Sequence, residues 1–77
     1  MTDLRHQQGV VELGHGKEGQ RYLVDARLVE SLQPLGPEEA IQAILSSHLQ
    51  TPFVVKSIVP VRDKNNVTLG YTVLIAR

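Results

Sequence analysis

The chain contains no cysteine and no tryptophan, and its only aromatic residues are Tyr22, Phe53 and Tyr71. Without cysteine, neither a disulfide bond nor a zinc–thiolate site can stabilise the fold. Three aromatic side chains are few for a surface that stacks the bases of single-stranded nucleic acid. A chain of 77 residues buries only about 60% of the surface that its unfolded form exposes. We therefore expect its stability to depend on close packing and on association with other chains.

The chain also lacks an excess of charge of either sign, because eight basic residues balance eight acidic residues. A domain that binds polyanions and a polybasic membrane anchor both carry a basic excess. The charge balance therefore argues against a nucleic-acid partner and predicts no contact with a membrane.

Long apolar runs are missing as well. None reaches the length of a transmembrane helix, and the polar residues 1–8 contain no signal-peptide core. We therefore expect a cytoplasmic protein. Residues 1–8 are expected to form a flexible N-terminus, and residues 9–77 a single α+β domain.

The strongest pattern in the sequence is the alternation of apolar and polar residues on both sides of the polar segment 63–66. This pattern predicts a C-terminal β-hairpin. One face of its first arm carries Phe53, Val55, Ser57, Val59 and Val61, and one face of its second arm carries Val67, Leu69, Tyr71, Val73 and Ile75.

A second hairpin is predicted nearer the N-terminus. Residues 9–13 and 20–28 suit strands, and the glycine-rich segment 14–19 between them suits a loop longer than two residues. The end of the second strand is ambiguous, because Asp25 could instead cap a short helix within residues 25–33.

One longer helix is predicted between the hairpins. Pro37 suits its first position, two glutamates follow in its first turn, and Pro52 ends it. The apolar residues spaced three and four apart are Ala40, Ile41, Ile44, Leu45, His48 and Leu49. This stripe is the face that must be buried.

The predicted element order is β-β-α-β-β, and the fold class is α+β. We expect a two-layer sandwich, in which the two hairpins form one mainly antiparallel sheet and a single helix packs on one face. The order of the strands in the sheet is left open. This element order resembles that of ubiquitin-like β-grasp folds, and such a likeness of fold carries no function.

The sharpest local motif is Gly14-x-Gly16-x-x-Gly19, which follows a predicted strand. A dinucleotide site needs a helix after these glycines, whereas this sequence continues as a strand. The motif also resembles the glycine-rich loop of protein kinases. The simplest interpretation is that the glycines adopt positive φ angles in a turn, and the alternative is a backbone nest for an anion, helped by Lys17 and Arg21.

The candidate ligand-binding residues are Gly14, His15, Gly16, Lys17, Gly19 and His48. No histidine stands at metal-ligand spacing from another histidine or a carboxylate, and no serine lies in a nucleophile elbow. The sequence therefore predicts no catalytic residue, no metal and no cofactor, and it leans away from an enzyme.

The last predicted strand is also apolar on its second face, through Leu74 and Ala76, and we expect Leu23, Val54 and Ile58 to add to that same face. One helix covers only one side of a sheet, and an uncovered apolar face marks an interface. The sequence therefore predicts a homodimer or higher homo-oligomer, with a further protein as a second kind of partner.

Three functions follow from these observations. The first is a small non-enzymatic interaction or regulatory module that self-associates through its sheet. The second is a binder of a small molecule or anion, or a minor enzyme, with its site at a dimer interface. The third is a nucleic-acid-binding accessory protein that uses the basic side chains near the hairpin ends, namely Lys17, Arg21, Lys56, Arg62 and Lys64.

Overall fold

The computed structural model describes residues 9–77. The predicted flexible N-terminus, residues 1–8, lies outside the described residues. The elements are β1 (Val10–Gly16), β2 (Gly19–Asp25), α1 (Ala26–Glu30), α2 (Pro37–Leu49), β3 (Val54–Arg62) and β4 (Thr68–Ala76).

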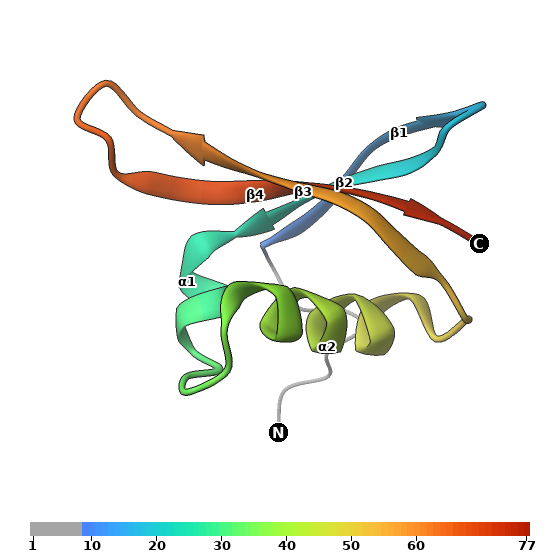
Figure 1. Cartoon of the computed structure of the whole chain (residues 1–77), viewed down its shortest axis with the longest axis horizontal. Coiled ribbons are helices and arrows are strands. Elements are labelled where there is room, and N and C mark those ends of the chain that lie inside the picture. Colours follow the sequence, from blue (N-terminus) through green and yellow to red (C-terminus); the bar gives the residue numbers. More distant parts are fainter. Residues whose placement is uncertain (1–8) are drawn as a thin grey trace.

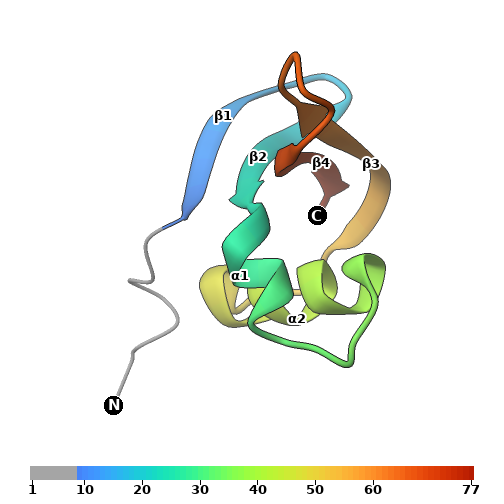
Figure 2. The same cartoon turned by 90° about the vertical axis from the view of Figure 1, so that its left-hand side faces the viewer.

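The strands form a four-stranded antiparallel sheet in the order β1-β2-β4-β3. Both helices lie on the same side of this sheet (Figures 1 and 2). The predicted α+β fold, with an antiparallel sheet and one main helix, is confirmed. The strand order, which the sequence left open, places β2 and β4 in the centre and makes β1 and β3 the edges.

The sheet is strongly twisted. The two hairpin turns rise from opposite corners (Figure 1), and the corners where β1 and β3 begin curve toward the helices (Figure 2). The face away from the helices therefore has the shape of a saddle, which follows from the right-handed twist of neighbouring strands.

The core lies between α2 and the central strands. Its fully buried large side chains are Ile41 and Leu45 from α2, Val24 from β2, and Val73 and Ile75 from β4. The apolar stripe predicted on the helix therefore packs against the central strands. The start of the helix also has the predicted features. Pro37 occupies the first turn beside two glutamates, and the helix ends at Leu49, followed by the capping residue Gln50, whose φ is 58°.

The prediction of a strand to residue 28 was wrong at its end, and the alternative of a short helix is confirmed. β2 stops at Asp25, whose Oδ1 accepts a hydrogen bond of 2.8 Å from the backbone N–H of Arg27. This contact satisfies one of the unpaired N–H groups at a helix start. The turn that follows buries Ala26 and Val29 against the core.

A bulge in β3 corrects the faces predicted for this strand. Its register with β4 shifts between Val55 and Ser57, so Lys56 is an extra residue. Val55 and Ile58 consequently both pack against the core, whereas Ser57 and Val59 pair with Leu74 and Thr72 on the other face. The placement of Ile58 on the outer face was therefore wrong.

The turn between β3 and β4 is built as predicted around residues 63–66. The Oδ1 atom of Asp63 accepts hydrogen bonds from the backbone N–H groups of Asn65 (2.8 Å) and Val67 (3.0 Å). The side chains of Val67 and Leu69 are each 54% exposed, so the predicted apolar face of the second arm reaches the core only from Tyr71 onward. In the described part of the chain, no helix has the length and hydrophobicity needed to cross a membrane.

The cap at Asp25 gives a first testable expectation. Asp25→Ala should lower the free energy of unfolding by about 1 kcal/mol, because it removes the acceptor that starts α1, and Asp25→Asn should lower it by only a few tenths. Urea denaturation at neutral pH measures both values. Equal losses in the two variants would contradict the capping role.

The same residue predicts a dependence on pH. The hydrogen bond from the Arg27 side chain, helped by the bond from the Arg27 backbone N–H, lowers the pKa of Asp25 below its ordinary value of 3.8. Its stabilising contribution should therefore be full above pH 3.8 and should be lost as the pH falls through the lowered pKa. Asp25→Asn should remove this part of the acid dependence, which urea titrations at several pH values would reveal.

Candidate functional site

The sheet face opposite the helices is an apolar surface that the described residues leave uncovered. Its members alternate along the strands with buried residues, so that Leu23 lies between Tyr22 and Val24, and Leu74 between Val73 and Ile75. We call this surface the open face. Its apolar members are Val11, Leu13, Leu23, Val54, Val59, Val61, Leu74 and Ala76.

Strand pairing arranges the open face in rows that run across the sheet. The central row is Val11, Leu23, Thr72 and Val59, with one residue from each strand. Directly paired side chains lie about 4.5–5.5 Å apart at Cβ, so this row forms a continuous strip. Val11 and Val59 at its ends are 53% and 52% exposed.

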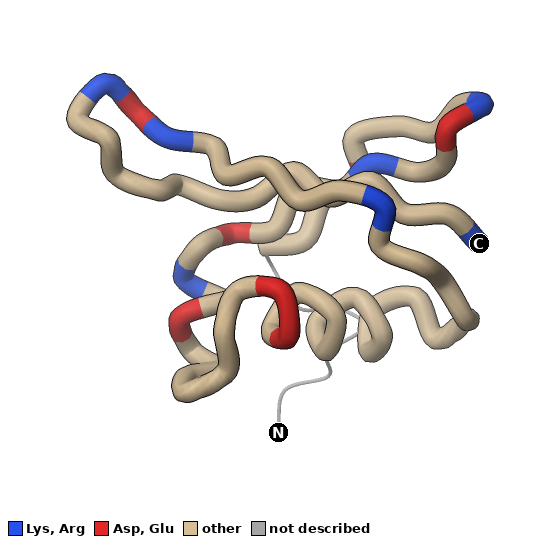
Figure 3. Tube along the Cα trace, in the orientation of Figure 1, with Lys and Arg blue, Asp and Glu red and all other residues tan. Residues whose placement is uncertain are grey.

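Two further rows flank the central row. One contains Arg21, Leu74 and Ser57, and the other contains Asp25, Gly70 and Val61. Figure 3 shows that charged residues gather near the hairpin turns and around the helices, and that the middle of the sheet is largely free of them. The open face is therefore an apolar centre with charge toward its borders, which is the general anatomy of a protein interface.

The predicted glycine-rich site forms the tip of the first hairpin. β1 extends to Gly16 and β2 begins at Gly19, so the turn is only Lys17-Glu18, and the prediction of a longer loop was wrong. β2 follows the glycines directly, which leaves no helix start to hold a pyrophosphate.

The glycines of this tip differ in whether the backbone requires a residue without a side chain. Gly14 and Gly19 have φ angles of +148° and +135°, in the region that side chains rarely adopt. A Cβ at Gly19 would also overlap the carbonyl oxygen of Ile75, whereas a Cβ at Gly16 would meet nothing within 4 Å. Gly19 is therefore needed for the close approach of β2 and β4, which supports the structural interpretation of the motif.

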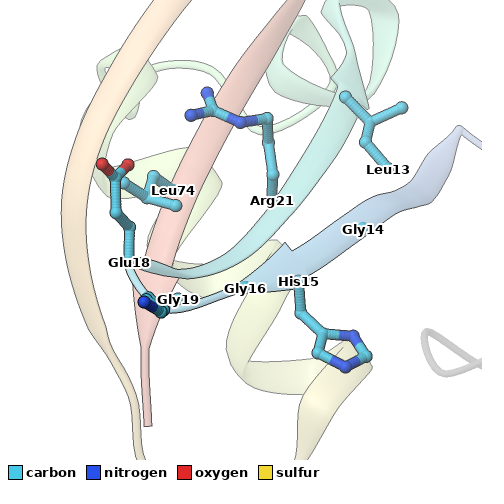
Figure 4. A pocket seen from close by; sticks show the side chains of 9 residues that line it. Leu13, Gly14, His15, Gly16, Glu18, Gly19, Arg21 and Leu74 are labelled. Atoms are coloured by element: carbon cyan, nitrogen blue, oxygen red, sulfur yellow. The ribbon is translucent and has the colours of Figure 1, made fainter.

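A shallow cavity of about 330 Å³ lies beside this tip (Figure 4). It is lined by Leu13, Gly14, His15, Gly16, Lys17, Glu18, Gly19, Arg21 and Leu74. In Figure 4 the side chains of Leu13, Arg21 and Leu74 lie on one side of the hairpin, and His15 points to the other. The cavity is thus the outer end of the open face, because Arg21 and Leu74 belong to both.

His48 lies apart from the other candidate residues. It stands in the last turn of α2, on the covered side of the sheet, where its ring meets Tyr22 edge to face at 6.0 Å between centroids. Its Nδ1 is buried and has no hydrogen-bond partner among the described residues. The structure therefore brings together Gly14, His15, Gly16, Lys17 and Gly19, and it leaves His48 as a residue at the boundary of the core.

The described residues offer no cluster of three or more histidines and carboxylates that could hold a metal. Sequence patterns missed Val11, Leu13, Val59 and Val61 as members of the open face; the bulge at Lys56 accounts for the two residues of β3. Alternation within residues 9–13 was the available signal, but a bulge between Glu12 and Gly14 interrupts it after three residues.

Comparisons with protein-family models, with curated proteins and with solved structures find no match to this chain.

The structural role of Gly19 can be tested against its neighbour. Gly19→Ala should lower the free energy of unfolding by about 1–3 kcal/mol, because the residue would keep a strained φ and push the Ile75 carbonyl away. Gly16→Ala is the matched control and should change stability little, since its Cβ has open space. Urea denaturation measures the free energy of unfolding of both variants. Similar losses in the two variants would refute the role assigned to Gly19.

Proposed function

We propose that this protein is a small non-enzymatic interaction module that self-associates through the open face of its sheet. The observation that carries the proposal is the central row, Val11, Leu23, Thr72 and Val59, which crosses all four strands with no described residue covering it. A contiguous apolar surface of this kind is costly to expose to water and marks an interaction site.

The size of the open face sets the expected strength of association. Four strands about 4.8 Å apart and about seven residues long, at about 3.3 Å per residue, span roughly 440 Å². A standard interface buries about 800 Å² of accessible surface on each partner. The open face is therefore about half the size of a standard interface. We therefore expect a dimer that dissociates at micromolar concentrations.

A second candidate function is supported by the cavity at the tip of the first hairpin. Lys17 and Arg21 line it together with glycine backbone, and it opens at the edge of the open face. A small anion bound in this cavity would lie at the border of the dimer, which is where the second predicted function places its ligand site. The nearby carboxylate of Glu18 lowers the positive potential of this cavity, so we rank this function second.

The nucleic-acid function receives the least support. Its five basic residues divide between the ends of the sheet, with Lys17, Arg21 and Lys56 toward the first hairpin turn and Arg62 and Lys64 at the second. A cytoplasmic location fits the absence of cysteine, and it stays a prediction.

Self-association through the open face predicts a specific sensitivity to charge. Val59→Lys should abolish the concentration-dependent rise in mass, because it places an ammonium group in the apolar central row. Val67→Lys is the matched control, since Val67 is 54% exposed and Val59 52%, and Val67 lies in the turn outside the sheet.

Native mass spectrometry and sedimentation equilibrium, from about 10 μM to 1 mM protein, measure this effect. We expect dimer in the unmodified protein and in the Val67 variant, and monomer in the Val59 variant. A wild-type protein that stays monomeric throughout would refute self-association. A defined extra mass retained on the native protein would instead favour the small-molecule function.

A further inference from the structure

The open face carries two opposite charges in a symmetric position on β2. Arg21 and Asp25 lie two residues before and two residues after Leu23, on the same face of the strand. Each is therefore about 6.6 Å along the strand from Leu23. Leu23 belongs to the central row, so the charges lie at equal distances on opposite sides of that row.

Of these two charges, only Arg21 lacks an ion-pair partner within residues 9–77. The one salt bridge of this part of the chain joins Asp25 to Arg27, at 3.2 Å between Oδ2 and Nη2, so a docked arginine would share this carboxylate with Arg27, whose side chain is 89% exposed. No carboxylate of residues 9–77 lies within ion-pair distance of Arg21. Arg21 instead stands beside Leu74 in the flanking row. An arginine in such a position is suited to a carboxylate on a docked surface.

A second copy of the same sheet supplies that carboxylate if it is turned over about a two-fold axis along the central row. This rotation places β2 on β2 of the partner with opposite direction, so Arg21 lies over the partner's Asp25. An axis parallel to the strands would instead place β2 over β4, with Arg21 facing Leu74 and Asp25 facing Gly70 of the second copy. Charge therefore distinguishes the two arrangements.

The side chains of β4 favour the same axis. Leu74 and Gly70 occupy the flanking rows at equal distances from Thr72, so rotation about the central row sets each leucine over a glycine. A side chain at position 70 is excluded within the chain itself, because its Cβ would stand 2.8 Å from the carbonyl oxygen of Val24. The largest side chain that β4 places on the open face thus meets the one position of this strand that has no side chain.

The shape of the sheet permits this packing. A saddle keeps its form when it is turned over about an axis across its strands, so two copies fit face to face. Sheets packed in this way lie about 10 Å apart, with strands crossing at about 30°. At a distance of two residues from the axis this crossing displaces facing positions by only about 3–4 Å, which a flexible arginine can span.

We infer that the occupant of the open face is a second copy of this chain, related by a two-fold axis along Val11, Leu23, Thr72 and Val59, with two reciprocal Arg21–Asp25 ion pairs. This inference rests on the proposed self-association and adds its geometry. The ion pairs lie at the borders of an apolar centre, so they select the arrangement more than they strengthen it.

A double-mutant cycle tests the inference. The dissociation constant of the dimer is measured by sedimentation equilibrium at low salt for the wild type, Arg21→Glu, Asp25→Asn and the double variant. Asparagine is used because it caps a helix as well as aspartate does and so preserves α1. Lys64→Glu and Glu30→Gln are controls, since they make the same charge changes outside the open face.

Asp25→Asn should weaken the dimer about 2- to 30-fold, which is the effect of losing two exposed ion pairs. Arg21→Glu should weaken it more, because it sets two pairs of carboxylates against each other. In the Asp25→Asn background, the effect of Arg21→Glu should shrink at least several-fold, since the facing carboxylate is gone. The controls should stay within about twofold of the wild type, as expected for distant exposed charges.

Two results would overturn the inference, and they are distinguishable. A dimer that Val59→Lys dissociates, but in which the effects of Arg21→Glu and Asp25→Asn are simply additive, would leave the proposed function intact and refute this axis. A wild-type chain that is monomeric at about 1 mM would refute self-association itself, and with it this geometry.

Discussion

The fold depends on the contact between one apolar stripe of α2 and the inner face of β2 and β4. Ile41 and Leu45 are fully buried against Val24, Val73 and Ile75, and no other long helix is present among residues 9–77 to form a second layer of this kind. A single helix shields only one side of a sheet. The apolar side chains on the other side of the same strands are consequently left to interactions beyond the chain.

Much of this arrangement could be predicted from local patterns. The turn at Asp63, the start of α2 at Pro37 and the burial of Ile41 and Leu45 all follow from rules that act within a few residues. Strand order and the faces of β3 could not be predicted, because they depend on pairing between distant segments. The bulge at Lys56 shifts the alternation of core-facing and outward-facing residues by one position, and no residue pattern within β3 predicts it.

The candidate site was predictable to a similar degree. The apolar second face of β4 was visible as Leu74 and Ala76, since alternation is intact there. The residues that complete the open face from β1 were hidden by the bulge after Glu12. His48 and the glycine-rich tip both carry candidate chemistry, but His48 stands in the last turn of α2 and does not line the cavity beside the tip.

The bulge at Lys56 also has a consequence for comparing this chain with others. In a strand, the side that a residue faces is decided by counting from a fixed point, and one inserted residue changes the count. A homologous strand lacking the residue at Lys56 would keep the same partners on β4, so its following side chains would face the same sides of the sheet as they do here. Matching the two sequences without a gap at Lys56 would pair core positions with surface positions, so β3 should be aligned by its partners on β4.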